Sequence, residues 1–274
     1  MLKLVILGTG NLSKQLCRAL APAKGVQIVQ LVGRSAREFG KFPGAIPKST
    51  DFHDIAEADL YLLAVNDDAI PELSGHLAQR RGLVAHTSGT VPLQALRASD
   101  RGVFYPLQTF SAARAVDFTD IPLCLEAERP ESLRLLETLG RALSGQIHEI
   151  GSGQRKILHL AAVFVNNFTN ALYGVGQEIC RQEGLSFDLL KPLILETAQK
   201  VQAILPGEAQ TGPARRGDLR TQGEHLELLR DQDHKALYAL LSETIKKQAM
   251  HPRDRPWDQR EQTHKPKIDH EEEL

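Results

Sequence analysis

A glycine-rich turn near the start of the chain is the first feature that could do chemistry. Gly8-Thr9-Gly10 directly follows the apolar run Leu4–Leu7 and precedes a stretch with apolar residues at helical spacing. In such a turn the first glycine permits a tight bend, the second lets the backbone approach a phosphate, and the following helix offers free N–H groups. Ser13 takes the place of a third glycine, where a small residue still lets the helix pack closely on the strand. The turn predicts a dinucleotide site, and a turn that binds nothing is the alternative. The residues predicted to contact the cofactor here are Gly8, Thr9, Gly10, Asn11 and Leu12.

The end of the second apolar run indicates which dinucleotide binds. An NAD site usually has an acidic residue at this place for the ribose hydroxyls, whereas this chain has Arg34 and Ser35 after Gly33. A guanidinium and a hydroxyl suit a 2′-phosphate. The pair therefore favours NADP(H), and a solvated arginine on a loop is the alternative.

Two more segments should lie at the same edge of the predicted sheet, where ligands bind in such folds. Val65 and Asn66 follow the third apolar run and are predicted to face the cofactor. His86-Thr87-Ser88-Gly89 follows the next run, and its hydroxyls and amides suit the nicotinamide ribose or a substrate oxyanion. We expect Ser88 and Gly89 to take this role, and a plain ST-turn is the alternative.

A third group of polar residues recurs at helical spacing further along the chain. Lys156, His159, Val163, Asn166 and Asn170 form one stripe of an otherwise apolar helix, which we expect to face a cleft. Lys156 or His159 could give a proton to a carbonyl or imine as hydride arrives, and Asn166 could orient the substrate. A satisfied structural histidine is the alternative. The apolar residues on the other faces are predicted to pack in a core, among them Phe164, Val165 and Phe168.

The elements that must position these residues alternate between short apolar runs and amphipathic stretches, which predicts an α/β fold with a mostly parallel sheet. A crossover helix is predicted over Pro130–Leu143. The predicted strands are Lys3–Leu7, Gln27–Val32, Leu60–Ala64, Leu83–His86, Leu123–Glu126 and Gln146–Glu149.

The pattern changes after residue 150, where strand-like runs give way to long helical ones. We expect a Rossmann domain over 1–150 and an all-α domain for substrate binding and dimerisation over 151–250. The charged, proline-rich segment 251–274 is predicted to be disordered. The helices expected in the second domain are Gln154–Glu183, Ser186–Leu205 and Leu226–Gln248, with a polar segment from Thr211 to Gly223.

Composition narrows the class of protein. The chain has 274 residues and a formal net charge of −1, which gives no overall attraction to nucleic acid or to an anionic membrane. The three cysteines are too scattered for a disulfide framework or a zinc site, so no metal is expected. Without a signal peptide or a membrane-length apolar segment, the protein is expected to be cytoplasmic.

The motifs together resemble a bacterial family described as a Rossmann-like domain followed by a helical domain of unknown function, over residue 1 to about 248. That group is similar to the deazaflavin-dependent NADP oxidoreductases, pyrroline-5-carboxylate reductase, ketopantoate reductase and the β-hydroxyacid dehydrogenases. In the hydroxyacid enzymes a helix lysine is followed four residues later by asparagine, whereas Leu160 follows Lys156 here, which makes His159 and Asn166 better candidates. The motifs that carry the resemblance are Gly8–Asn11, Gly33–Ser35, His86–Gly89, Tyr105–Phe110, His159 with Ala161–Phe164, Asn166–Phe168, Thr211–Pro213 and Arg216–Asp218.

This resemblance implies NADP binding and a homodimer built through the helical domains. We therefore expect an NADP-dependent oxidoreductase that transfers hydride between NADP(H) and a small carbonyl, imine or hydroxyl substrate in the interdomain cleft. Two alternatives remain open. One is a catalytically silent NADP-binding protein that senses redox state or serves in an assembly, and the other is an NADPH:deazaflavin oxidoreductase.

Overall fold

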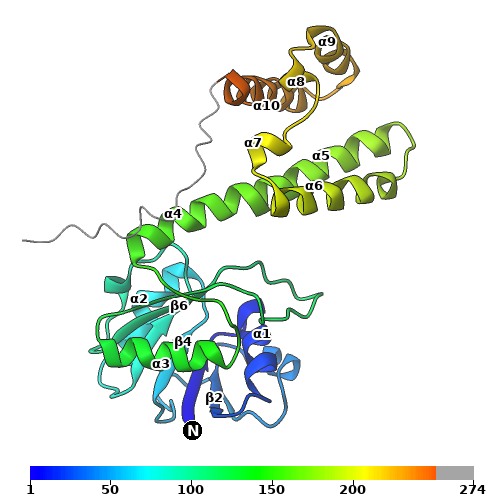
Figure 1. Ribbon diagram of the computed structural model, residues 1–274. Helices are drawn as coiled ribbons and strands as arrows, with labels where there is room; N and C mark the ends of the chain where they lie inside the picture. Colours follow the sequence, from blue (N-terminus) through cyan, green and yellow to red (C-terminus); the bar gives the residue numbers. More distant parts are fainter. Residues whose placement is uncertain (251–274) are drawn as a thin grey trace, which may run out of the picture. The chain divides into compact units, whose positions relative to one another are not determined.

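The first half of the chain forms one eight-stranded sheet, shown in Figure 1 as part of the computed structural model, which describes residues 1–250. Its strand order is β3-β2-β1-β4-β5-β6-β7-β8. Strand β7 runs antiparallel to β6, and the other neighbouring strands are parallel. The first six strands follow the order 3-2-1-4-5-6 of a Rossmann fold. The predicted mostly parallel sheet is thus confirmed. The strands are β1 (Leu2–Leu7), β2 (Val26–Val32), β3 (Lys48–Ser49), β4 (Leu60–Leu63), β5 (Leu83–His86), β6 (Arg101–Pro106), β7 (Leu123–Ala127) and β8 (Ile147–Glu149).

The central strands are apolar on both faces because helices and loops cover both sides of a parallel sheet. All four residues of β4 are buried, as are the last four of β1. Helix α1 (Asn11–Leu20) buries Leu16, Cys17 and Leu20 in the core cluster on one face. Helix α3 (Pro130–Arg141) packs into the same cluster and confirms the predicted crossover. The other face is covered in part by α2 (Ile70–Gly75), and short 3-10 turns lie at η1 (Ala36–Lys41), η2 (Asp67–Ala69) and η3 (Leu93–Ala95).

Two strands were not predicted. Strand β3 has only two residues, too few to show a pattern. Strand β6 begins with Arg101 and Gly102 and ends at Pro106, so only Val103–Tyr105 form an apolar run. Proline is tolerated at this strand end, where its missing N–H removes no ladder bond.

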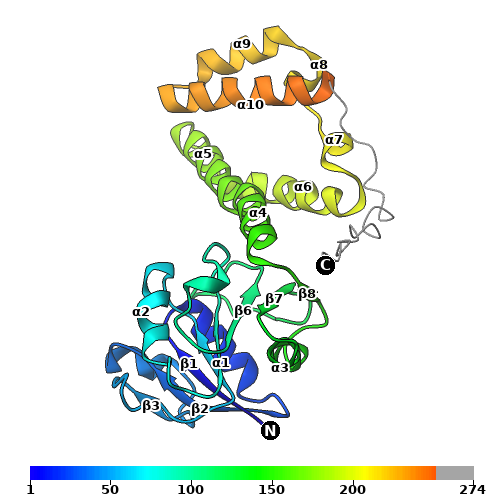
Figure 2. The same ribbon diagram turned by 90° about the vertical axis from the view of Figure 1, so that its left-hand side faces the viewer.

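The chain after β8 is helical, as predicted. Helix α4 (Ser152–Ala162), a π-helical turn (Val163–Phe168) and α5 (Thr169–Gln182) follow one another without a break. A 3-10 turn η5 (Phe187–Leu190) leads into α6 (Lys191–Ala203). The remaining helices, seen in Figure 2, are α7 (Pro206–Ala209), α8 (Pro213–Arg216), α9 (Leu219–Leu228) and α10 (Gln232–Met250).

The last predicted helix is wrong in detail, because the structure has two helices where one was expected. Helix α9 begins inside the segment Thr211–Gly223, which was predicted to be polar and was not assigned to a helix. Asp218 caps it, since the Asp218 carboxylate accepts a 3.0 Å hydrogen bond from the backbone N–H of Thr221. Gly217, just before the cap, has a φ of 69°, a left-handed conformation that glycine adopts without strain. The cap and the glycine are local signals that the apolar periodicity did not reveal.

Two units divide the chain by their internal contacts, Met1–Phe168 and a second that begins at Thr169. The domain boundary predicted at residue 150 lies where β8 ends, whereas α4 and the π turn group with the sheet. The predicted disordered segment 251–274 lies outside the described residues. Among residues 1–250, the helices are all too short or too polar to cross a membrane.

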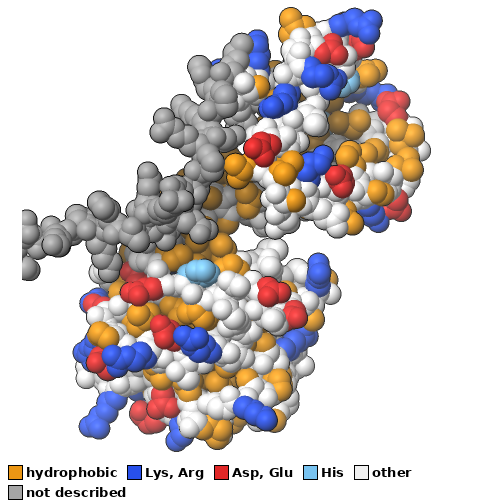
Figure 3. Space-filling view, in the orientation of Figure 1, with side chains coloured by type: hydrophobic (Ala, Val, Ile, Leu, Met, Phe, Trp, Pro, Cys, Tyr) orange, Lys and Arg blue, Asp and Glu red, His pale blue; other side chains and the backbone are white. Residues whose placement is uncertain are grey.

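Large apolar side chains stay exposed along the helices, as Figure 3 shows. Phe164, Val165 and Phe168 were predicted to pack in a core, but they are 60%, 76% and 49% exposed. The π turn that holds these three residues buries none of its side chains. Among described residues 169–249, Ala214 is the one buried hydrophobic side chain. The core of the described chain therefore lies around the sheet.

Candidate functional site

A pocket of about 610 Å³ lies at the carboxyl ends of β1, β2 and β4. Gly8 follows β1, Gly33 follows β2 and Ala64 follows β4. Strand order reverses between β1 and β4, and ligands of open α/β sheets bind at such switch points. The lining residues are Gly8, Thr9, Gly10, Gly33, Arg34, Glu38, Phe52, Ala64, Val65, Asn66, Asp68, Ala69, Glu72 and Leu73.

The two glycines of the turn are required for different reasons. Gly8 has a φ of 121°, and a Cβ placed there would lie 2.2 Å from the carbonyl oxygen of Ala64. Only glycine fits between β1 and β4 at this point. Gly10 has ordinary extended backbone, and a Cβ there would meet no atom within 4 Å. Gly8 therefore serves the fold, whereas Gly10 leaves open space for a ligand to approach the backbone.

The N-terminus of α1 opens beside this space. Gly10 is the N-cap, no side chain caps the helix, and no acidic residue stands in its first turn. Ser13 is fully buried and donates a 3.2 Å hydrogen bond to Ala64 O, so the small residue does let the helix pack on β4. The amide of Asn11 points elsewhere and donates to Phe110 O at 3.2 Å. The free N–H groups and helix dipole favour an anion here.

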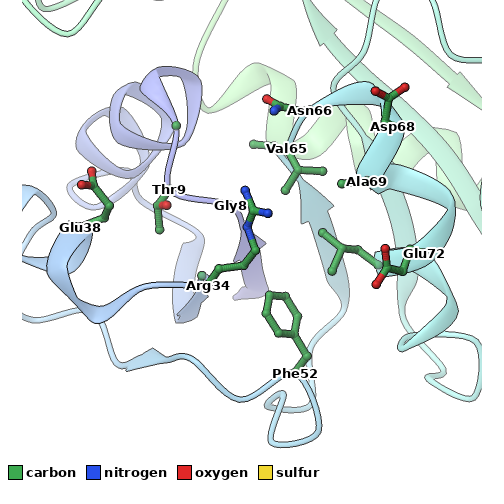
Figure 4. Close-up of a pocket in the computed structure, with 14 residues that line it drawn as sticks. Gly8, Thr9, Arg34, Glu38, Phe52, Val65, Asn66, Asp68, Ala69 and Glu72 are labelled. Atoms are coloured by element: carbon green, nitrogen blue, oxygen red, sulfur yellow. The ribbon is translucent and has the colours of Figure 1, made fainter.

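Arg34 supplies the cation of the pocket. Figure 4 shows its side chain reaching into the pocket, with the ring of Phe52 next to it. Glu38 also lines the pocket, but its carboxylate pairs with Lys41 at 2.8 Å and with Lys14 at 3.8 Å. The hydrogen bond from Lys41 holds the pKa of the Glu38 carboxyl below its usual range. The pocket thus combines an exposed guanidinium with an acid already engaged by lysines.

The pocket brings together about half of the predicted cofactor residues. Those that line it are Gly8, Thr9, Gly10, Arg34, Val65 and Asn66. Those outside its lining are Asn11, Leu12, Ser35, Ser88 and Gly89. The lining residues that sequence reasoning missed include Phe52 and Glu72. Glu72 stands six residues after Asn66, so its place near the same sheet edge could have been inferred from the sequence. Phe52 follows the two-residue strand β3, which is too short to show a strand pattern in the sequence.

A tyrosine and a histidine meet near the end of β6. The hydroxyl of Tyr105 and Nδ1 of His159 are 3.0 Å apart and share a hydrogen bond, and the two rings meet edge to face. Gly89 packs against both, because a Cβ there would lie 2.6 Å from His159 Nδ1 and 2.9 Å from Tyr105 Cζ. Burial raises the pKa of the Tyr105 hydroxyl. Residues from three of the motifs found in the sequence, Gly89, Tyr105 and His159, therefore converge.

The turn that holds Gly89 has its own polar core. His86 is fully buried, and burial, with a smaller effect from the nearby charge of Arg155, lowers the pKa of its imidazole to about 4. Nδ1 of His86 accepts a 3.1 Å hydrogen bond from the N–H of Ser88. The Ser88 hydroxyl in turn accepts from the N–H groups of Thr90 and Val91. The ST-turn considered as the alternative is present, and it ties up the Ser88 side chain.

Of the predicted catalytic stripe, His159 is the member that meets the sheet edge. Lys156 is exposed. Asn166 is also exposed, and its amide donates to the Asn167 side chain at 3.4 Å. The π turn at Val163–Phe168 forms i→i+5 hydrogen bonds, so residues beyond it fall out of step with a stripe drawn at α-helical spacing. The continuous stripe that the sequence predicted is therefore interrupted.

Comparisons with known proteins agree with this fold. The family described as a domain of unknown function, DUF2520, matches residues 121–245. A candidate NADP oxidoreductase from Bacteroides fragilis is 38% identical, with a TM-score of 0.82, and the match covers 90% of this chain and 98% of that one. A protein from Thermotoga maritima is 22% identical, with a TM-score of 0.76 and coverage of 90% and 100%.

A more distant structure, pyrroline carboxylate reductase from Plasmodium falciparum with NADP bound, is 14% identical, with a TM-score of 0.57 and coverage of 90% and 97%. No curated protein matches the chain. The resemblance to a Rossmann-like domain followed by a helical domain is confirmed by the family match and by the similarity to the Bacteroides protein.

Proposed function

The chain belongs to the DUF2520 family, and we propose that it is an NADP(H)-dependent oxidoreductase acting on a small carbonyl, imine or hydroxyl substrate. The observation that carries this proposal is the pocket at the switch point, where Gly8, Gly10 and Arg34 surround one cavity. The similarity to a candidate NADP oxidoreductase over 90% of the chain supports it.

The residues of the pocket fit NADP(H). The uncapped N-terminus of α1 and the open space at Gly10 suit the pyrophosphate. Arg34 offers a two-pronged donor for the 2′-phosphate, and Phe52 offers an aromatic face beside it for the adenine. We assign Ser88 and Gly89 to contacts with the nicotinamide end of the cofactor. When bound, NADPH supplies the hydride.

Reduction of a carbonyl or imine carbon also needs a proton on the oxygen or nitrogen. We assign this proton to His159, whose Nδ1 shares a hydrogen bond with the Tyr105 hydroxyl. Tyr105 orients the imidazole and can pass a proton to it, which matches the usual arrangement of a general acid held by a second group. Lys156 is the second candidate donor, and Asn166 is assigned to substrate orientation.

The cofactor assignment is tested by ligand-dependent stability. NADPH should raise the melting temperature more than NADH, because a ligand that binds only the folded state stabilises it by mass action. Arg34→Asp should erase the difference. Arg81→Asp is the matched control, since Arg81 is exposed and precedes β5, at the sheet edge away from the pocket. Equal shifts for both cofactors in the unaltered protein would contradict the NADP preference.

The chemical assignment is tested by NADPH consumption with a panel of small keto acids and cyclic imines. His159→Ala and Tyr105→Phe should each lower turnover by at least a hundredfold, in line with general acid catalysis. The turnover of Lys156→Ala measures separately whether Lys156 is the proton donor. Turnover that is unchanged in all three variants would remove the site assignment. Tight NADPH binding with no turnover would favour the silent sensor, and reduction of a deazaflavin alone would favour the third alternative.

We also propose that the protein forms a homodimer through its helical part. Large apolar side chains such as Leu189, Leu193 and Leu195 are 71%, 62% and 57% exposed, and such surface usually marks an interface. A second copy is the partner that the family resemblance implies. Analytical ultracentrifugation should give twice the chain mass, and Leu189→Glu with Leu193→Glu should shift it toward the monomer. A monomer at micromolar concentration would refute this proposal.

A further inference from the structure

Arg155 is a fully buried guanidinium on α4, an unusual place for a charge that so strongly prefers water. One of its terminal nitrogens forms an ion pair with the carboxylate of Glu126, on β7. The other donates to the carbonyl oxygen of Val91 at 2.6 Å and to the hydroxyl of Ser152 at 3.2 Å. A single side chain thus links three segments.

Ser152 completes the arrangement. Its hydroxyl donates to Glu126 at 2.7 Å and accepts a 3.0 Å hydrogen bond from the backbone N–H of Leu93. We call Glu126, Ser152 and Arg155 the clamp. It joins strand β7, the first turn of α4 and the segment that follows the Ser88–Gly89 turn. These contacts are directional, so they fix orientation as well as distance.

Each segment that the clamp holds carries or neighbours one member of the Tyr105–His159–Gly89 group. His159 stands four residues after Arg155, on the same face of α4. Val91 stands two residues after Gly89. In the β6–β7 ladder, Tyr105 is paired with Cys124, two residues before Glu126. Every segment that forms the contact of His159 with Tyr105 and Gly89 is therefore held by the clamp within about one helical turn or two residues of that contact.

We propose that Arg155 and Glu126 are positioning residues, which hold the His159 imidazole against the Tyr105 hydroxyl and Gly89. The role of that contact in proton delivery rests on the proposed function. A buried ion pair seldom gives more stability than apolar residues of the same volume, but it fails unless its geometry is satisfied. An apolar anchor would hold α4 on the sheet without setting its rotation, whereas the clamp sets both.

Electrostatics add a second effect at the same place. The Tyr105 hydroxyl shares a hydrogen bond with His159 on α4, and the charges of Arg155 on α4 and Cys124 on β7 act on its pKa. Burial raises the pKa of Tyr105, and the positive charge of Arg155 opposes that rise. Loss of the guanidinium would make the phenol a weaker acid as well as loosen the histidine.

The test follows the Tyr105–His159 contact directly by nitrogen NMR of labelled histidine, in the full chain and without substrate. The His159 resonances are identified by their loss in His159→Gln. As the only change in the protein, Tyr105→Phe should shift the Nδ1 resonance of His159, because it removes the hydrogen bond to that atom.

The His159 resonances with and without Tyr105→Phe are then compared in a second protein, the double variant Arg155→Met with Glu126→Gln, which lacks the charges of the clamp. This pair of changes removes both charges together and so avoids an unpaired buried ion. Adding Tyr105→Phe there should leave the His159 resonances nearly unchanged, because the contact is already lost. A shift as large as in the unaltered protein would overturn the proposal.

The control background is Arg101→Met with Glu128→Gln, another Arg–Glu pair on the same sheet, at the opposite end of β6 from Tyr105. In this background Tyr105→Phe should shift the His159 resonance as much as it does when it is the only change. If that shift were lost, the assignment of the effect to the clamp would be overturned. If the double variant does not fold, Arg155→Lys decides, since lysine keeps the charge but lacks the second prong to Val91. It too should shrink the Tyr105→Phe shift.

These results are independent of turnover. NADPH affinity should change little in the clamp variants, because the pocket assigned to the pyrophosphate and the 2′-phosphate is lined by none of the clamp residues. A protein that shows the NMR coupling but reduces no substrate would refute the proposed function and keep the clamp. If turnover is found, the clamp variants should lower kcat at least tenfold with little change in the KM for NADPH.

Discussion

The two glycines of the first turn allow a sharp separation of folding from binding. Gly8→Ala places a methyl group 2.2 Å from Ala64 O, on a backbone with a φ of 121°. A non-glycine residue in such a conformation costs about 1 to 3 kcal/mol. Moving Ala64 away also disturbs its 2.8 Å bond to Leu7 O and the bond from Ser13, each worth about 1 kcal/mol. We expect a total loss of about 3 to 5 kcal/mol in unfolding free energy.

Gly10→Ala should have the opposite profile. Its backbone suits alanine and its Cβ meets no atom, so the fold should lose about 1 kcal/mol or less, from the poorer N-cap. The methyl group fills the space assigned to the pyrophosphate, however. Overpacking of about 1 to 3 kcal/mol lowers NADPH affinity roughly tenfold to a hundredfold.

The assay is urea unfolding followed by circular dichroism, together with calorimetric titration of NADPH, on both variants. The expected result is a destabilised Gly8→Ala protein and a stable Gly10→Ala protein that binds NADPH poorly. A stable Gly8→Ala protein, or a Gly10→Ala protein with unaltered affinity, would refute the division of roles between the two glycines.

Three further predictions follow from single residues. The pKa of His86 is about 4 in the folded protein, below the 6.5 of a free histidine, so the unfolded chain binds more protons between these values. Unfolding free energy should therefore fall by about 3 kcal/mol as pH drops from 6.5 through 4, and His86→Asn should remove this part of the slope in urea titrations. Phe52→Ala should weaken NADPH binding roughly tenfold in calorimetry if its ring stacks on the adenine, whereas Phe52→Tyr should not. Asp218→Ala should lower the helical content or melting temperature through loss of the α9 cap, worth about 1 kcal/mol, while Asp218→Asn should largely keep it.

The parts of the pocket that sequence reasoning predicted are those with a local signal. Gly8, Gly10 and Arg34 each stand at the end of an apolar run, and the ends of parallel strands meet at one edge. Phe52 was not predicted to line the pocket, because β3, which precedes it, has only two residues and shows no strand pattern. Ser88 was assigned to the cofactor by its position, yet its hydroxyl accepts hydrogen bonds within the local turn, a contact that has no signal in the sequence.

The helical part shows a different limit of the sequence. Its apolar periodicity predicted correctly that this part is helical, but not the separation of α9 from α10. It also did not predict which face would be buried, because burial depends on what packs against each helix. The π turn at Val163–Phe168 has no distinct composition, and it breaks the spacing that linked His159 to Asn166. The contact of His159 with Tyr105 joins residues 54 positions apart, a distance over which periodicity carries no information.

The central claim, that this protein transfers hydride from NADPH, is tested most directly with NADPH deuterated at the transferred position of the nicotinamide. After incubation with the keto acid and cyclic imine panel, mass spectrometry of the products measures transfer of the label. We predict one deuterium in the reduced product, with formation of that product greatly slowed in Tyr105→Phe and His159→Ala. NADPH binding without label in any product across the panel would contradict the claim.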